Sequence, residues 1–329
     1  MGWADIRANK ARTSVTIQNI GSVSKTVTAT GVMQLVEQKR FRLASEAGEL
    51  VGFPIRNRLH PNSPITVEHL LRHESSIQDS RAYGASYSCG DPTVSLREWI
   101  ESYLKADGEH YHEERNFTTE APGEQFVYSN VGYGLLGLIV EAASGLPLTE
   151  YCEKNVFGPL DMANTGWMIE DIDVDTHAIP YVPLEGHDGR GLGVAALPEE
   201  GCRELCLYSF PNYPDGLVRT SPEQLSHYLG AYANGGEYAG YRLLEASTIR
   251  AMLSGRGASS EKPRHGLCWS ARGTGSGLLW GHGGGDPGIA THMEFDPVAK
   301  AGAIVFVNGL GRESIYPRLH QLSESLIAR

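Results

Sequence analysis

The hydrophobic pattern near the start of the chain predicts a short strand followed by a long buried helix. A run rich in β-branched residues, Ser14 to Ile20, meets Gly21, and the stretch from Val23 to Val36 that follows is almost free of charge. A surface helix shows one apolar stripe and one charged face, whereas a helix that is apolar all round is buried. We therefore expect residues 23–36 to form a central helix.

The rest of the pattern predicts helices in the middle of the chain and strands at its end. Capped or amphipathic segments predict helices after Thr66, over about 96–105 and 131–145, from Thr149, after Ser221 and over about 246–253. From His265 the period changes, and four strand-like runs separated by short turns predict an antiparallel meander before a C-terminal helix. Residues 165–218 are rich in Gly, Pro and Asp and predict a long loop that wraps a site.

This order of elements predicts an α/β (α+β) fold, in which helices flank an antiparallel sheet and an all-α insertion interrupts the sheet domain. We expect residues 1–60 and 200–329 to form the discontinuous sheet domain. Residues 61–199 are expected to form the mainly helical insertion. The active site is then expected in the cleft between the two parts, where ligands commonly bind.

Composition and charge narrow the classes of partner. Hydrophobic residues make up 41% and charged residues 20%, as in soluble globular proteins. The net charge of −11 disfavours nucleic acids and anionic membranes as partners. No apolar stretch reaches the length of a membrane span, and the first residues lack an apolar signal core. We expect the chain as given to be cytoplasmic, or exported if a further segment precedes it.

The cysteines give a weak signal. They are five in number and scattered, which indicates mostly buried free thiols. A pair between Cys202 and Cys206 stays open, because connectivity cannot be deduced from spacing alone.

One Ser-x-x-Lys motif stands out by its context. The spacing occurs three times, at Ser22/Lys25, Ser102/Lys105 and Ser259/Lys262. Only the first follows a strand-like run and opens an apolar helix, whereas the second lies in an amphipathic pattern and the third in a loop-like stretch. Residues three apart share one face of a helix, so this pair places a nucleophilic hydroxyl beside a possible base. We expect Ser22 to be the nucleophile.

Proton transfer needs a group that can accept the proton of Ser22. Lys25 lies in the first turn of an apolar helix, and both the helix dipole and burial predict a lowered pKa that would leave it partly neutral. Tyr128, in the run Y-S-N, is a second candidate, because a nearby ammonium pulls a phenol toward phenolate. Asn130 in the same run supplies a neutral amide that can orient a substrate.

A glycine-rich run late in the chain predicts a binding edge for substrate. The segment W-G-H-G-G-G-D-P-G, residues 280–288, contains three consecutive glycines at the end of a predicted strand, where a ligand can approach bare backbone. A backbone N–H of this run, together with that of Ser22, can form an oxyanion hole. The candidates are Gly284 and Gly285, with His282 as a titratable group on the rim.

The runs S-V-S-K, Y-S-N and H-G-G, in this order and with their flanks, resemble the serine β-lactamase and penicillin-binding-protein superfamily. The likeness is greatest to class C β-lactamase-like hydrolases, which include family VIII carboxylesterases and D-aminopeptidases, and it covers nearly the whole chain. The resemblance implies Ser22 as the acylated nucleophile, with Lys25 and Tyr128 as the proton-transfer pair. It also implies Asn130 as a substrate contact and the N–H of Gly285 as the second oxyanion donor.

Two departures from the family pattern shape the expectations. His282 stands where β-lactamases carry the lysine of their Lys-Thr-Gly motif, and a largely neutral histidine suits the carboxylate of a β-lactam less well than a fixed cation. Only 21 residues precede Ser22, whereas family members usually have a helix and two strands there. We expect the first two strands of the sheet to be missing, which would leave an unpaired edge open to homo-oligomer formation.

Three competing motifs are weaker. Tyr232-Ala-Asn234 also fits Tyr-x-Asn, but it ends a helix before two glycines, which is typical of a C-terminal cap. The run His110-Tyr-His112-Glu113 lacks further metal ligands at short range and indicates a solvated loop. The His-Gly-Gly-Gly run of α/β-hydrolases precedes a G-x-S-x-G elbow, and this chain has none. His73 and His292 are interpreted as structural or surface residues.

Together, these observations predict a serine hydrolase without metal or cofactor that forms an acyl-enzyme at Ser22. The expected partner is a small-molecule ester, or an amide or β-lactam. The first alternative is a D-amino-acid peptidase or a weak β-lactamase. An alternative of another class is a catalytically inactive binding homologue, which the short N-terminal part suggests.

Overall fold

The computed structural model describes residues 2–185, 189–255, 264–273, 277–309 and 315–327. Helices lie mainly in the middle of the chain, between Ser24 and Met252, as expected, and one more follows the last strand. Their bounds are α1 Ser24–Glu37, α2 Ala47–Val51, α3 Val67–Leu71, α4 Arg81–Ala85, α5 Leu96–Leu104, α6 Glu113–Asn116, α7 Asn130–Ser144, α8 Leu148–Cys152, α9 Pro222–Ala233, α10 Ala246–Met252 and α11 Tyr316–Ile327. Two short 3₁₀ helices, η1 (Gly21–Val23) and η7 (Tyr213–Asp215), lie at the candidate site.

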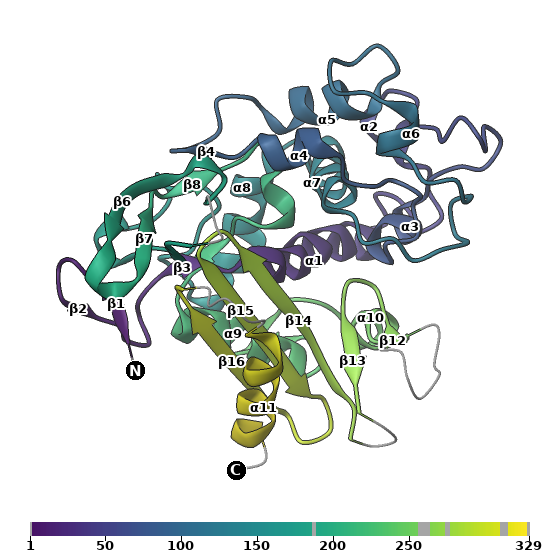
Figure 1. The fold of residues 1–329 in the computed structure, drawn as a ribbon. Helices are drawn as coiled ribbons and strands as arrows, with labels where there is room; N and C mark the ends of the chain where they lie inside the picture. Colours follow the sequence, from purple (N-terminus) through teal and green to yellow (C-terminus); the bar gives the residue numbers. More distant parts are fainter. Residues whose placement is uncertain (1, 186–188, 256–263, 274–276, 310–314, 328–329) are drawn as a thin grey trace.

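The main sheet is an antiparallel meander of five strands in sequence order. Its strands are β12 Arg264–His265, β13 Ser270–Arg272, β14 Leu279–Asp286, β15 Ile289–Asp296 and β16 Ala301–Val307. Helix α11 packs against β15 and β16 on one face, and α9 and η1 pack on the other side of the same strands (Figure 1). The prediction of a mixed fold with an antiparallel C-terminal meander is confirmed.

Short strand pairs account for the remaining sheet structure. Their bounds are β1 Trp3–Asp5 with β2 Lys10–Ala11, β3 Gln18–Asn19 with β9 Arg219–Thr220, β4 Ser88–Cys89 with β8 Tyr208–Ser209, β10 Glu237–Tyr238 with β11 Tyr241–Arg242, and the three-stranded β5 Tyr181–Pro183, β7 Cys202–Leu205 and β6 Gly193–Leu197. The strand expected over residues 14–20 is therefore only two residues long. The stretch 165–218, expected to be a long loop, contains β5, β6 and β7, which pair with one another, and β8, which pairs with the distant β4.

Helix α1 is the centre of the molecule, as its pattern predicts. Every residue from Ser24 to Leu35 is buried. The helix lies between the sheet and the helical layer and packs along α7, which is itself buried from Val131 to Val140 (Figure 1). A helix in this position cannot carry charges toward solvent on any side, and this explains its uncharged sequence.

Side-chain caps explain where several helices begin. Thr66 and Ser95 each accept a hydrogen bond from the third residue of α3 and α5, and both helices show a full capping box. Ser129 and Ser221 cap α7 and α9 in the same way, so the expected helix start after Ser221 is confirmed.

Strand β16 forms one edge of the main sheet. Among the described residues, its ladder of backbone pairs runs only to β15. The expected edge strand is therefore present. The two-domain division and homo-oligomer formation through this edge stay predictions. In the described part of the chain, no single helix is long and apolar enough to cross a bilayer, and one bent pair (Asn130–Ser144 with Leu148–Leu160) meets that test by length and composition only.

A disulfide joins Cys89 to Cys206 across 117 residues. Cys202 is a free thiol, so the possible Cys202–Cys206 pair was wrong, while Cys152 and Cys268 are buried free thiols as expected. The pairing of β4 with β8 brings Cys89 and Cys206 together, with their Cα atoms 5.7 Å apart. The spacing of the cysteines along the chain does not indicate this pairing.

Candidate active site

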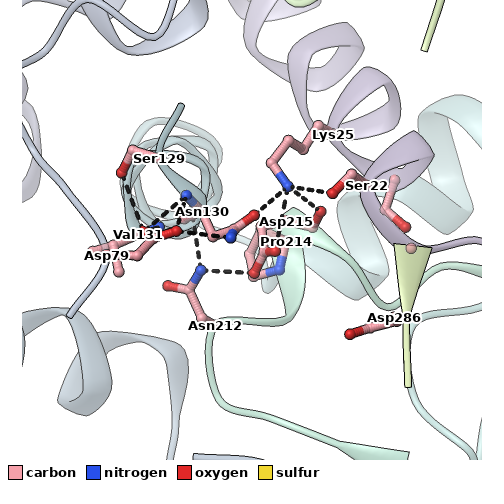
Figure 2. A network of polar contacts seen from close by, with 12 residues as sticks. Ser22, Lys25, Asp79, Ser129, Asn130, Val131, Asn212, Pro214, Asp215 and Asp286 are labelled. Carbon is pink, nitrogen blue, oxygen red and sulfur yellow. Dashed lines mark hydrogen bonds and ion pairs between the residues drawn. The ribbon is translucent and has the colours of Figure 1, made fainter. Parts of the chain in front are cut away.

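Ser22 and Lys25 lie at the junction of η1 and α1, where the sequence predicts them. Lys25 is fully buried, and its Nζ lies 3.0 Å from Ser22 Oγ (Figure 2). The two side chains project from successive turns on one face, because the helical path continues from η1 into α1. This places a hydroxyl and an amine in direct hydrogen-bond contact.

Lys25 is surrounded by acceptors. Its Nζ lies 2.7 Å from Asn130 Oδ1, 2.8 Å from the carbonyl oxygen of Asp215 and 3.3 Å from Asp215 Oδ2 (Figure 2). Burial by itself lowers the pKa of Lys25, but Tyr128, Asp215 and Asp79 together raise it above its ordinary value. The prediction of a lowered pKa was therefore wrong, and Lys25 is held as an ammonium.

Asp215, on η7, was not found from the sequence. Its Oδ1 accepts from Asn212 Nδ2 at 2.8 Å, and its Oδ2 accepts from the Tyr83 hydroxyl at 2.9 Å. Burial raises the pKa of this carboxyl, and Lys25 and the other donors oppose that rise. Since every polar neighbour of the side chain is a donor, we describe it as a carboxylate paired with Lys25. It lies in a Gly- and Pro-rich stretch 190 residues from Lys25, and no local pattern marks it.

Tyr128 stands at the mouth of the site. The ammonium nitrogen of Lys25 lies 5.0 Å from the centroid of its ring, and the residue is 40% exposed. Burial of the hydroxyl raises the pKa of Tyr128, and the neighbouring Lys25 lowers it by less. The expected pull toward phenolate is therefore present but does not dominate, so the resting group is a phenol.

His73 supports Tyr128 from behind. The two rings stack with their centroids 4.2 Å apart. The backbone N–H of Ser129 donates to His73 Nδ1 at 3.1 Å, which fixes the imidazole against the run that carries Tyr128. Burial holds the pKa of His73 well below its ordinary value, so this imidazole stays neutral. The sequence interpretation of His73 as structural or surface missed its contact with a candidate catalytic group.

Asn130 is the first residue of α7, and Asp79 fixes its orientation. The Asp79 carboxylate accepts from the backbone N–H groups of Asn130 and Val131 and from Asn130 Nδ2 at 2.8 Å (Figure 2). A carboxylate at a helix N-terminus is favourable both for its hydrogen bonds and for the dipole. Since Asp79 binds the amide nitrogen, the amide oxygen of Asn130 must face Lys25.

Strand β14 brings the predicted glycines against η1. A Cβ on Gly284 would lie 2.0 Å from the Ile20 carbonyl oxygen, and a Cβ on Gly21 would lie 2.8 Å from the backbone nitrogen of Gly285. Only residues without side chains permit this approach, which sets the backbones of Ser22 and Gly285 side by side.

His282 occupies the same strand and is partly buried. Burial and the nearby Lys25 lower the pKa of His282 to about 3, so it is neutral at physiological pH. Its Nδ1 lies 2.7 Å from the carbonyl oxygen of Gly283. The neutral state expected for this histidine agrees with its surroundings.

Asp286 ends β14 beside η1 and was not selected from the sequence. It accepts from the Tyr87 hydroxyl at 2.7 Å and from Asn19 Nδ2 at 3.3 Å. Burial is the main cause that raises the pKa of Asp286 to about 7. The surroundings of Ser22 therefore contain two carboxyl groups, the buried Asp215 and the partly buried Asp286.

The competing motifs lie elsewhere. Ser102 Oγ donates to the Trp99 carbonyl, and Lys105 pairs with Glu101 on the surface of α5. Ser259 and Lys262 lie outside the described residues. Tyr232 is buried in α9.

The fold and this site define a class: a mixed sheet-and-helix domain with a Ser-x-x-Lys pair at the start of its central helix. The β-lactamase family model matches residues 1–324, and the chain belongs to this family, whose members are serine hydrolases.

Solved structures and curated relatives agree with the family. A penicillin-binding protein homologue from Pyrococcus abyssi, described as octameric, aligns with a TM-score of 0.74 and 25% identity over 99% of this chain and 69% of its own. D-amino acid amidase from Ochrobactrum anthropi SV3 aligns with a TM-score of 0.78 and 21% identity over 99% and 88% of the two chains. At that identity, the amidase supports the fold alone.

Two curated proteins add sequence evidence. Penicillin-binding protein 4* of Bacillus subtilis is 24% identical over 89% of this chain and 60% of its own length. Protein flp of Staphylococcus aureus strain COL is 25% identical over 69% of this chain and 41% of its own length. The chain thus spans about two fifths to three fifths of the curated relatives it matches.

Proposed function

We propose that the protein is a serine hydrolase that works through an acyl-enzyme at Ser22. The observation that carries this proposal is the 3.0 Å contact between Lys25 Nζ and Ser22 Oγ, with the ring of Tyr128 centred 5.0 Å from the same ammonium. A hydroxyl held by an ammonium, beside a phenol that can accept its proton, is an arrangement suited to nucleophilic catalysis.

The route of the proton follows from the state of Lys25. An ammonium can only donate, so Lys25 donates to Ser22 Oγ and turns the serine hydroxyl proton away from itself. The proposed acceptor of this proton is the neighbouring Tyr128, once it is in its phenolate form. Lys25 stabilises that phenolate, and Tyr128 then returns the proton to the leaving group.

The charge that develops on the substrate carbonyl needs donors. The backbone N–H groups of Ser22 and Gly285 are the proposed pair, since the glycines of β14 and η1 hold these two backbones together. The ammonium of Lys25 is the proposed source of further stabilisation near the attacking oxygen. Asn130 is the proposed contact for the acyl part of the substrate.

Esters are the proposed main substrates, with amides and β-lactams second. A neutral His282 at the rim gives no fixed cation for a β-lactam carboxylate, and the nearby carboxyl groups of Asp215 and Asp286 further disfavour anionic substrates. The structural likeness to a D-amino acid amidase makes D-amino-acid amides the second candidate class. Exchange of His282 for lysine is expected to raise nitrocefin hydrolysis relative to p-nitrophenyl ester hydrolysis.

The proposal is tested by labelling with a fluorophosphonate or p-nitrophenyl acetate and mapping the adduct by mass spectrometry. We expect the label on Ser22 and its loss in Ser22→Ala. The matched control is Ser102→Ala, which removes the serine of the second Ser-x-x-Lys motif and is expected to keep full labelling. A label on another residue, or turnover that survives in Ser22→Ala, would contradict the proposal, and absence of turnover on all three substrate classes would favour the inactive binding homologue.

The disulfide bears on where the protein matures. Stable disulfides form mainly in oxidising compartments, so the Cys89–Cys206 bond supports export over the cytoplasmic alternative. Alkylation of free thiols in freshly lysed cells tests this: oxidised Cys89 and Cys206 support export, and reduced ones support the cytoplasm.

A further inference from the structure

A buried cluster of two histidines and one glutamate lies beneath α11, on the face of the main sheet that this helix covers. His292 and Glu294 are alternate residues of β15, so their side chains share that face, and His320 reaches them from α11. His292 Nε2 lies 3.0 Å from Glu294 Oε2 and 3.1 Å from His320 Nδ1. His292 and Glu294 are 3% and 1% exposed.

Hydrogen bonds within the cluster do not satisfy all of its atoms. A single proton on His292 Nε2 can point fully at Glu294 or at His320, but not at both, because the two contacts leave the same nitrogen. The second oxygen of Glu294, Oε1, is buried and has no hydrogen-bond partner among the described residues. Buried polar atoms without partners are costly, and a bound ion is one ordinary explanation for them.

The neighbouring strand leaves room beside the cluster. Gly281 and Gly283 of β14 face the same side as His292 and Glu294. A Cβ on Gly281 would lie 2.7 Å from the Cβ of Glu294, and one on Gly283 would lie 4.0 Å from His292 Nδ1. Bare backbone at these two positions therefore lets the carboxylate and the imidazoles converge under α11.

We propose that this cluster is a binding site for a divalent transition-metal ion, with His292 Nε2, His320 Nδ1 and Glu294 as ligands. The three ligand atoms lie within 4.8 Å of one another. Two imidazoles and one carboxylate form a set that Zn²⁺ accepts, with water at the fourth position. The cluster faces away from η1, so the ion takes no part in the acyl chemistry proposed for Ser22.

Arg272 is the built-in competitor of the ion. Its guanidinium pairs with Glu294 and lies 3.5 Å from His292 Nε2, and its side chain is 34% exposed. An arginine this exposed can turn into solvent when an ion arrives. Metal and guanidinium thus exchange at one carboxylate, and removal of the guanidinium is expected to strengthen metal binding.

The ion would join α11 to the sheet. Helix α11 begins at Tyr316, whose hydroxyl donates to the Gly284 carbonyl at 3.1 Å. Coordination of one ion by His320 and by the ligands on β15 would hold α11 against the sheet, and α11 in turn supports strand β14, which carries Gly284. Metal binding should therefore raise the temperature of unfolding, since a ligand that binds only the folded state stabilises it.

The test is a titration of the metal-stripped full chain with ZnCl₂ by calorimetry, and with CoCl₂ by visible absorption. We expect one ion per chain. His320→Ala should weaken binding by at least roughly 100-fold, because even partners outside the coordination shell contribute about 10–100-fold. Arg272→Gln should strengthen binding by roughly tenfold. The matched control, His112→Ala, removes an exposed histidine of another loop and should change nothing.

A thermal readout supplements the titration. Zn²⁺ should raise the unfolding temperature of the unaltered protein and of Arg272→Gln, but not of His320→Ala. His320 lies on a partly exposed helix, so this variant is expected to fold. The proposal is overturned if neither the unaltered protein nor Arg272→Gln binds a stoichiometric ion, or if binding in His320→Ala is as tight as in His112→Ala.

Discussion

The Cys89–Cys206 disulfide offers a sharp test of the described architecture. We consider the double variant Cys89→Ser/Cys206→Ser, which leaves both strands but opens a loop of 117 residues. In the chain-entropy treatment, closing a loop of that length removes about 16 cal/mol/K from the unfolded chain, or about 5 kcal/mol at 25 °C. Measured losses for native disulfides run from about 2 to 5 kcal/mol, so the calculation gives the upper end.

The assay is equilibrium unfolding in urea, followed by fluorescence and circular dichroism. The variant should lose about 2–5 kcal/mol, and its m-value should rise because the uncrosslinked chain exposes more surface when unfolded. The matched control is Cys202→Ser, which removes a free thiol from β7 and should change the free energy of unfolding by less than about 0.5 kcal/mol. A loss below about 1 kcal/mol with an unchanged m-value would refute the reasoning.

The same variant has a functional consequence that separates it from simple destabilisation. The segment before Cys89 carries Tyr83 and Tyr87, whose hydroxyls donate to Asp215 and Asp286. Opening the disulfide frees this segment. The kcat of ester hydrolysis should therefore fall even at urea concentrations well below those of the unfolding transition. An unchanged kcat would mean that the two tyrosines hold their places without the covalent bond.

The remaining predictions concern the proton acceptor and the glycine strand. The pKa of Lys25 and that of Tyr128 are both raised, so the deprotonated base appears only at high pH, and kcat/KM for a p-nitrophenyl ester should still rise above pH 8; a plateau from pH 6 would contradict this. Asp215→Asn removes a charge that contributes to raising the pKa of Tyr128, so the rise should move to lower pH, as a pH–rate profile would reveal; an unmoved profile would exclude this coupling. Gly284→Ala should abolish activity, because the added Cβ would meet the backbone at 2.0 Å. Gly285→Ala should lower kcat/KM less than about tenfold, because its Cβ meets only the movable end of a tyrosine side chain. Equal losses of activity in the two variants would contradict the packing.

The local part of the site could be predicted from the sequence because it depends on periodicity. Ser22 and Lys25 are three residues apart, and the uncharged run behind them marks a buried helix. Tyr128 and Asn130 lie at the start of another apolar helix, and His282 lies in a glycine-rich run. Each of these signals is carried by fewer than about 20 consecutive residues.

The non-local part had no such signal. Asp215 meets Lys25 through η7, and Cys89 meets Cys206 through two-residue strands that no propensity reveals. The error over the pKa of Lys25 has the same origin: burial and the dipole can be inferred locally, but the opposing carboxylate cannot. The contact of His73 with the candidate site was missed because His73 stacks on Tyr128, which lies 55 residues further along the chain.

Mutations on the two faces of strand β14 are expected to have different consequences. Its even positions, His282, Gly284 and Asp286, face η1, while its odd positions, Gly281, Gly283 and Gly285, face α11. Variation on the odd side can alter how the C-terminal helix is attached while leaving the groups around the serine in place, and variation on the even side can alter selectivity while leaving the helix attached. Mutations at the odd positions and at the even positions of this one strand can therefore be selected nearly independently of each other.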